Sequence, residues 1–236
     1  MNSAFIITLL SGFSFLVGYL ITVILKNNKK LVIFSLGFSF VVIFGLILFD
    51  LLPECLELVD NKLLIVLYGL IGIFILKLLD YFIPDHDHES NKKDHMEHIG
   101  LISFIALFIH NVIESTAIYT TSLTTINMGI IMAIGVSFHN IPLGIQISSL
   151  IKNNKIKLSL IMGLSLSSMI GIILLNIFKI TLNNSILCVL ISITLGMLTY
   201  IAFFELLCEV KENLKKKELQ LGVMSGVILV VLSQLL

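Results

Sequence analysis

Two pairs of histidine and asparagine lie deep inside long apolar segments of this chain. One pair, His110 and Asn111, is followed by Glu114, and the other pair is His139 and Asn140. Imidazole, amide and carboxylate groups are costly at membrane depth, about 2.5–3.5 kcal/mol for a central charge on insertion scales. Some function must offset that cost. These residue types bind divalent metal ions, so a metal ion crossing the membrane is the strongest candidate.

The spacing of these residues suits a single cation. His110 and Glu114 are four residues apart, so their side chains project from one face of a helix. Pro142 cannot donate a backbone N–H, so it predicts a kink that leaves the carbonyl of Phe138 free beside His139. Two nitrogens, one carboxylate and a water would make a four-coordinate site suited to Zn²⁺ and acceptable to Fe²⁺, Mn²⁺ or Co²⁺. The alternative is that each polar group only hydrogen-bonds a neighbouring helix.

The composition of the chain requires a lipid environment. Apolar residues make up 57% of it, and the mean hydropathy is +1.07. A transmembrane helix needs about 20 apolar residues, and eight segments qualify. They are residues 4–25, 31–52, 63–83, 99–122, 126–151, 156–180, 186–208 and 219–236. No other segment is long enough to form its own core. We therefore predict an all-α integral membrane protein with a single polytopic domain over residues 1–236.

The basic residues are distributed unevenly. All fifteen are lysines, and twelve of them cluster after the first, third, fifth and seventh segments, whereas the alternate loops carry only Lys62 and Lys179. The positive-inside rule places these loops in the cytoplasm and both termini outside, for a protein of the cytoplasmic (inner) membrane. The absence of arginine argues against nucleic acid as a partner.

A short acidic motif occurs twice. Asp50 and Glu54 close the second segment, and Glu205 and Glu209 close the seventh in the same pattern. The two segments run in opposite directions under this topology, which indicates an inverted repeat of helices 1–3 and 6–8 around central helices 4 and 5, a 3+2+3 arrangement typical of transporters. The acids are then expected at the entrance and exit of a pathway. The alternative is a chance match in a leucine-rich chain.

The only long polar segment is residues 84–98. It holds five acidic residues and four of the six histidines, namely His86, His88, His95 and His98. Histidine-rich tracts bind divalent metals weakly and adaptably, so we predict a cytoplasmic loop with auxiliary metal affinity. A solvated loop without a ligand is the alternative.

The motifs resemble the ZIP (Zrt/Irt-like) family of divalent metal transporters. The family hallmark is His-Asn-x-Pro-Glu-Gly on consecutive helices, and this chain adds Leu-Leu-Pro-Glu at residues 51–54 and Gly-Met-x-x-Tyr at residues 196–200. The resemblance implies eight helices and a binuclear metal pathway between the fourth and fifth, in an elevator-like or alternating-access bundle. The implied ligands are His110, Asn111, Glu114, His139 and Asn140.

Several positions depart from the family pattern. Leu143 stands where the fifth helix carries a bridging glutamate, and Ser168 stands at the glutamate position of the sixth helix. Ile113 and Ser115 replace the usual proline and glycine. The second metal position therefore lacks both carboxylates, and the resemblance implies a mononuclear site.

We predict that the protein is not an enzyme and carries divalent metal into the cytosol, with Zn²⁺ favoured and Fe²⁺, Mn²⁺, Co²⁺ or Cd²⁺ as other substrates. The sequence has no P-loop, so transport is expected to run down a gradient. One alternative is a transport-inactive ZIP-like metal sensor or scaffold, and a remote one is an intramembrane metallohydrolase. The expected partners are the lipid bilayer and a second copy of the chain in a homodimer.

Overall fold

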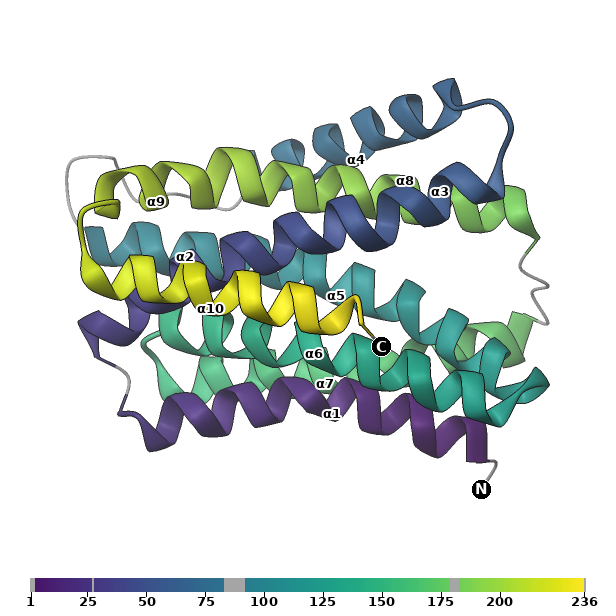
Figure 1. Ribbon diagram of the computed structural model, residues 1–236, viewed down its shortest axis with the longest axis horizontal. Helices are drawn as coiled ribbons and strands as arrows, with labels where there is room; N and C mark the ends of the chain where they lie inside the picture. Colours follow the sequence, from purple (N-terminus) through teal and green to yellow (C-terminus); the bar gives the residue numbers. More distant parts are fainter. Residues whose placement is uncertain (1–2, 27, 83–91, 179–182, 236) are drawn as a thin grey trace.

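The computed structural model describes residues 3–26, 28–82, 92–178 and 183–235, and every element in these ranges is a helix (Figure 1). The prediction of an all-α protein is therefore confirmed. The elements are α1 (Ser3–Ile24), α2 (Lys29–Gly45), η1 (Leu46–Leu51), α3 (Leu52–Leu58), α4 (Leu63–Phe82), α5 (Lys92–Thr124), α6 (Ile126–Leu150), α7 (Asn154–Phe178), α8 (Asn184–Tyr200), η2 (Ile201–Leu206), α9 (Leu207–Asn213) and α10 (Lys217–Ser233).

Within the described residues, seven stretches of continuous helix are long and apolar enough to cross a membrane, where the sequence predicted eight. The exception is α10, which has 17 helical residues and is thus about 25 Å long. This is slightly short of a hydrocarbon core of about 30 Å. Since α10 packs along α2, the eighth segment still belongs to the bundle.

The helices form two groups. The first contains α1, α5, α6 and α7, and the second contains α2 with α3, α4, α8 with α9, and α10. Within the first group, α1 packs so closely on α6 that only glycine fits at position 18. A Cβ on Gly18 would lie 2.3 Å from the carbonyl oxygen of Ile141. The groups meet where α6 packs on α2 and α5 packs on α8. The two helices that carry the histidines therefore lie at the centre of the molecule.

The second and seventh segments are built alike. Each consists of a 17-residue α-helix, a 6-residue π-helix and a 7-residue α-helix. Each also begins at an asparagine cap, since the side chains of Asn28 and Asn183 accept backbone N–H bonds from the first turn. Asp50 and Glu205 consequently occupy the same position within their π-helices. The two segments run in opposite directions in Figure 1, as an inverted repeat requires.

The two central helices are equivalent in the same repeat. Gly171 of α7 packs against Val112 and Ser115 of α5, and Gly18 of α1 packs against Ile141 and Gly144 of α6. The two pairs of contacts have identical spacing. Aligning α5 with α6 on these contacts superposes the two His-Asn pairs and also places Leu143 of α6 at the position of Glu114 of α5.

The contact between α4 and α8 leaves no room for a side chain, which yields a stability prediction. A Cβ on Gly196 would lie 1.9 Å from the carbonyl oxygen of Gly69. Gly196→Ala is expected to separate these helices and to lower the unfolding temperature in detergent, despite the gain of about 1 kcal/mol in helix propensity. Gly135→Ala is the matched control, because a Cβ there meets nothing within 4 Å. Equal unfolding temperatures for the two variants would contradict this packing.

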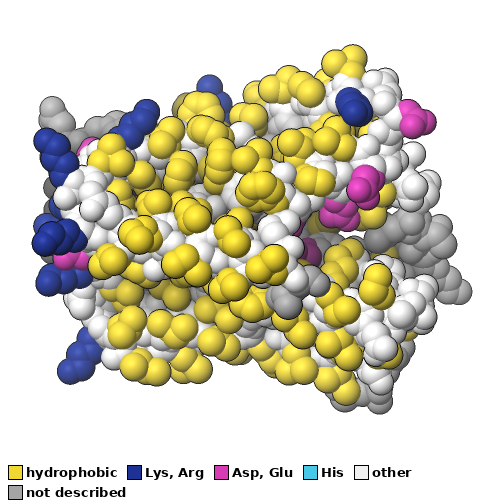
Figure 2. Space-filling model, in the orientation of Figure 1, with side chains coloured by type: hydrophobic (Ala, Val, Ile, Leu, Met, Phe, Trp, Pro, Cys, Tyr) yellow, Lys and Arg dark blue, Asp and Glu magenta, His cyan; other side chains and the backbone are white. Residues whose placement is uncertain are grey.

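Charged side chains mark one end of the bundle. Figure 2 shows lysines gathered at the end where α1 stops and α10 starts, here called the lysine-rich end. The sequence predicts a loop over residues 84–98, but residues 92–98 form the first turns of α5. The prediction of a loop is thus wrong for that part, because α5 extends well beyond its apolar stretch. The rest of the segment, with His86 and His88, lies outside the described residues.

Candidate metal site

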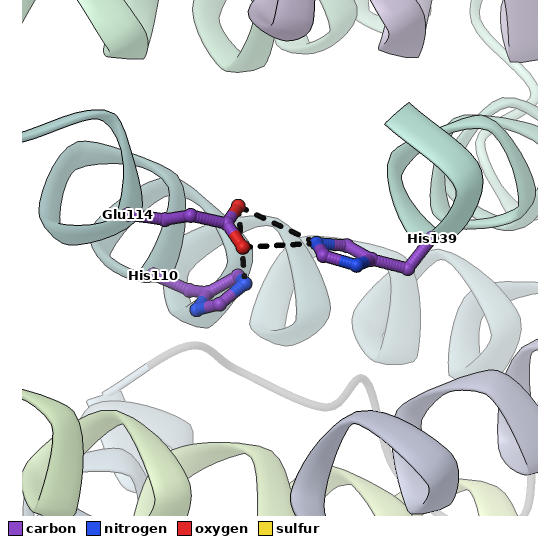
Figure 3. Close-up of side chains that lie close together, drawn as sticks. All are labelled: His110, Glu114 and His139. Carbon is purple, nitrogen blue, oxygen red and sulfur yellow. Dashed lines mark hydrogen bonds and ion pairs between the residues drawn. The ribbon is translucent and has the colours of Figure 1, made fainter. Parts of the chain in front are cut away.

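Helices α5 and α6 bring three side chains together near the middle of the bundle (Figure 3). Glu114 lies between the two imidazoles, with Oε2 3.5 Å from His110 Nε2 and Oε1 3.2 Å from His139 Nε2. One ligand atom from each residue lies within 4.8 Å of those from the other two. Ligand atoms around a tetrahedral zinc ion lie about 3.3 Å apart. The carboxylate–imidazole distances already match that value.

The central trio, His110, Glu114 and His139, is largely withdrawn from the surface. His110 is 2% exposed, while Glu114 and His139 are each 12% exposed. His110 and Glu114 are one turn apart on α5, so both side chains extend toward α6. His139 comes from α6, which packs against α5. A carboxylate and two imidazoles in such surroundings can bind a dication without full hydration, and three protein ligands leave a coordination position open.

The amide nitrogens of the two asparagines point to other helices. Asn111 Nδ2 donates to Ser167 Oγ at 2.6 Å and to the carbonyl oxygen of Leu164 at 3.1 Å, so its side chain faces α7. Asn140 Nδ2 lies 3.5 Å from the carbonyl oxygen of Ser11 on α1. Of the five predicted ligands, the two histidines and the glutamate therefore lie together. The amide nitrogens of the two asparagines contact neighbouring helices.

The two positions that lack the family's carboxylates are buried outside the cavity beside the trio. Leu143 and Ser168 are both 0% exposed. Leu143 belongs to the main apolar core, and Ser168 Oγ donates to the carbonyl oxygen of Ser165. Neither lines the cavity beside the trio. The predicted kink residue, Pro142, is buried inside α6, which continues as a helix to Leu150.

A cavity of about 280 Å³ connects the trio to the end opposite the lysines. Its walls come from the end of α2, η1, α3, the second half of α5, the first half of α6, the first two thirds of α8 and the end of α10. Asp50 and Glu54 line it together with the trio. Figure 2 shows acidic side chains beside a hollow at this end. The two predicted entrance acids therefore share one cavity with the predicted metal ligands.

On the lysine-rich side of the trio, the described part of the bundle contains fully buried apolar side chains. Ile102 and Ala106 of α5 are fully buried there, on the lysine-rich side of His110. The predicted exit acids are buried as well, with Glu205 8% exposed and Glu209 4% exposed. The cavity therefore lies on one side of the trio, toward the end opposite the lysines.

A second group of metal-binding side chains lies on the lysine-rich side of the trio. One ligand atom from each of Asp80, His98 and Glu205 falls within 4.8 Å of those from the other two. His98 Nε2 is 2.6 Å from Asp80 Oδ1, and Tyr200 donates its O–H to Asp80 Oδ2 at 2.8 Å. His95 Nε2 lies 3.7 Å from Glu209 Oε1 nearby. Sequence reasoning missed Asp80, because a lone acid at a span end carries no spacing signal, and it noted Tyr200 only as part of the Gly-Met-x-x-Tyr motif.

No family model matches the chain, but curated proteins resemble it over its length. Zinc transporter ZupT of Chlorobium chlorochromatii (strain CaD3) is 29% identical over 262 residues, covering 99% of this chain and 97% of the relative. Zinc transporter ZupT of Streptococcus mutans serotype c (strain ATCC 700610 / UA159) is also 29% identical, with the same coverage over 259 residues. A third protein of that name, from Chlorobaculum parvum (strain DSM 263 / NCIMB 8327), is 30% identical over 54% of the chain.

These relatives are named as transporters and not as enzymes, in agreement with the prediction that the chain is not an enzyme. They match across nearly all of the apolar helices, which supports a multi-pass membrane protein. The chain is thus similar along nearly its whole length to proteins named as zinc transporters, in agreement with its resemblance to the ZIP (Zrt/Irt-like) family of divalent metal transporters.

Proposed function

We propose that the protein carries a divalent metal ion, most readily Zn²⁺, across the cytoplasmic membrane through the central trio. The observation that carries this proposal is the convergence of His110, Glu114 and His139 at the inner end of an acid-lined cavity. Two nitrogens and one oxygen suit Zn²⁺ and are acceptable to Fe²⁺, Mn²⁺, Co²⁺ and Cd²⁺. The curated relatives named as zinc transporters support zinc as the first substrate to test.

The cavity serves as the entrance. Asp50 and Glu54 lie on its wall, and clefts lined by one sign of charge raise the local concentration of the opposite ion. A metal ion that sheds part of its hydration there meets Glu114 and His139 next. Because water can enter the cavity, it can also supply the fourth ligand of a mononuclear site.

The direction of transport follows from the lysines. The positive-inside rule places the lysine-rich end in the cytoplasm, and therefore the cavity and both termini outside. Glu205 and Glu209 then lie on the exit side, with His95 and His98 of α5 next to them. Inward movement is favoured by the membrane potential, by ~2.3 kcal/mol per charge per 100 mV.

A second candidate function is a metal sensor that binds metal without moving it. The observation behind it is the absence of carboxylates at Leu143 and Ser168, both of which are buried. This candidate predicts metal binding without flux.

The test is metal flux into proteoliposomes, comparing Zn²⁺, Fe²⁺, Mn²⁺ and Cd²⁺. Wild-type protein is expected to move Zn²⁺, and His110→Ala is expected to lose that flux while remaining folded. Thr124→Ala is the control, because this residue lies on the same helix but is exposed. If the folded wild-type protein binds Zn²⁺ but shows no flux, the result would contradict the carrier function and favour the sensor.

A further inference from the structure

Two buried polar side chains on the lysine-rich side of the trio have no hydrogen-bond partner among the described residues. Gln146 of α6 has both the oxygen and the nitrogen of its amide unpaired, and Ser103 of α5 has its hydroxyl unpaired. Both residues are 0% exposed. An amide or hydroxyl buried without a hydrogen bond destabilises the folded state. The chain therefore keeps these groups at a cost in stability, and a function must offset that cost.

Gln146 and Ser103 lie on the same helix faces as the metal ligands. Gln146 is seven residues after His139 on α6, and Ser103 is seven residues before His110 on α5. Seven residues make nearly two full turns, so each polar side chain projects in about the same direction as the histidine of its own helix. Both side chains therefore project into the contact between α5 and α6.

The packing of α5 on α6 places the two polar residues at one level of the bundle. The helices meet at the trio, and further along a Cβ on Gly100 of α5 would lie 3.2 Å from the Cβ of Leu150 of α6. The helices run antiparallel between these two contacts, so Ser103 and Gln146 are opposite each other. At 1.5 Å per residue, this level is about 10 Å from that of the histidines.

The inverted repeat relates this level to the cavity on the other side of the trio. When α5 and α6 are aligned on their glycine contacts, Met132 is the equivalent of Ser103, and Ala117 is the equivalent of Gln146. Met132 and Ala117 both line the cavity. In an inverted repeat, the equivalents of the residues that line one access route line the other. Ser103 and Gln146 therefore line the route from the trio to the lysine-rich end.

Helix α2 adds a third polar side chain at this level. Ser39 is 0% exposed and donates its hydroxyl to the carbonyl oxygen of Ser35, which leaves its acceptor lone pairs for another group. Ser35 Oγ is 2.6 Å from the Oγ of Ser149, one turn from Gln146 on α6. The repeat equivalent of Ser39 is Thr194 of α8, which also lines the cavity. Three helices thus supply uncharged oxygen atoms to the same level.

We propose that Gln146, Ser103 and Ser39 form a second position for the divalent metal ion, here called the neutral position, which receives the ion from the trio on its way to the lysine-rich end. The ion takes the amide oxygen and the two hydroxyl oxygens, and it keeps water in its other coordination positions. This inference rests on the proposed function, because the ion reaches the neutral position through the trio.

The chemistry of the neutral position suits a step that must release its ion. Imidazole and carboxylate bind Zn²⁺ more strongly than uncharged oxygen atoms do, so the ion is held firmly at the trio and weakly beyond it. Conduction requires such weak or successive binding. Long side chains in a helix lean toward its N-terminus, which on α6 brings the amide of Gln146 over Leu143 and toward the trio. The amide can therefore meet the ion as it leaves His139.

The variant Gln146→Leu separates this role from a structural one. It keeps the size of the side chain and removes the unpaired amide. Zn²⁺ flux is expected to fall at least about tenfold, since one contact to a charged group contributes a factor of that size. Equilibrium binding of Zn²⁺ is expected to be unchanged, because the trio is intact. The unfolding temperature in EDTA is expected to rise by roughly 3 °C, because no unpaired amide remains buried.

The matched control is Gln220→Leu, which makes the same change at an exposed position of α10. It is expected to leave flux unchanged. A Gln146 that only braced helices would make Gln146→Leu less stable than the wild type, and that result overturns the proposal. Unchanged flux in folded Gln146→Leu also overturns it. If Gln146→Leu fails to fold, Gln146→Met takes its place, since its unbranched side chain follows the path of the glutamine.

The juxtaposition of the two side chains is tested by Cd²⁺ binding, which does not require flux. The background is His110→Ala/Glu114→Gln, which lacks two ligands of the trio. Adding Ser103→Cys and Gln146→Cys together is expected to bind Cd²⁺ at least about 100-fold more tightly than adding either alone, because soft thiolates select this ion and two of them act on one ion. The native cysteines are the same in every variant, so the single additions account for them.

The outcomes separate this proposal from the proposed function. Equal Cd²⁺ affinity in the double and single cysteine additions overturns the neutral position even when wild-type flux is normal. Absence of wild-type flux contradicts the proposed function, and the Cd²⁺ titration then still decides whether Ser103 and Gln146 face one point.

Discussion

Glu114→Gln is expected to reduce Zn²⁺ flux more than about 100-fold. Glu114 is the only member of the central trio that contacts both imidazoles, at 3.5 and 3.2 Å, and the only one that carries a negative charge. Removing even an indirect partner of a metal ligand typically costs 10–100-fold in affinity or activity, so losing the ligand itself costs more. Glutamine keeps the shape, so the loss would come from the charge. The measurement is initial flux into proteoliposomes at several Zn²⁺ concentrations.

The control for this variant is Glu218→Gln, which makes the same change outside the pathway. Glu218 lies at the start of α10, where its carboxylate is 4.0 Å from the exposed Lys30. Exposed ion pairs of this kind contribute little to stability. Flux in Glu218→Gln is expected to equal that of the wild type. Undiminished flux in Glu114→Gln would show that the metal ion does not pass through the trio.

Leu143→Glu is expected to destabilise the metal-free protein and to add a second bound metal ion. Leu143 is the repeat equivalent of Glu114, so a carboxylate there would extend from α6 toward α5 as Glu114 extends toward α6. Leu143 is 0% exposed, and a charge at that depth costs about 3 kcal/mol. The unfolding temperature in EDTA is therefore expected to fall by roughly 5 °C or more. Zn²⁺ is expected to restore it, since a ligand that binds only the folded state stabilises that state.

The measurement combines thermal unfolding in detergent, with EDTA or with Zn²⁺, and the metal content per chain. Leu143→Gln is the matched control, because it adds a polar group of the same size without the charge and is expected to bind no extra ion. An unchanged metal content in Leu143→Glu would contradict the equivalence of residues 114 and 143. If the wild type binds metal without flux, a gain of flux in Leu143→Glu would instead favour the sensor.

The sequence by itself determined the elements and the central trio. Helix spans follow from apolar length, because backbone groups in a bilayer must be satisfied within each segment. The sequence could predict that His110 and Glu114 lie together, because side chains four residues apart share a helix face however the helices pack. His139 could be added because two consecutive spans joined by a short turn pack side by side. All three inferences depend on local geometry or on neighbouring segments.

The direction of each polar side chain around its helix was decided by tertiary packing. Asn111 and Asn140 belong to the same two motifs as the histidines, yet they face α7 and α1. A residue next to a ligand points about 100° away from it, and only the packing of α1 and α7 shows which helix lies in that direction. The family resemblance implies that these amides are metal ligands, and this stays a prediction, because the contacts with α7 and α1 involve only their Nδ2 groups.

Only the tertiary structure placed Asp80, His98, Tyr200 and Glu205 together, and only it distinguished the end that the cavity reaches from the lysine-rich end. These residues come from three helices that are distant in sequence, so no spacing rule connects them. The acidic motif repeats at both ends of the chain's pathway, but Asp50 is exposed and Glu205 is buried. The acidic motif cannot predict this difference in exposure, because the motif is nearly the same at the two ends of the bundle. It arises from how one half of the bundle packs against the other, which is a property of the assembled helices.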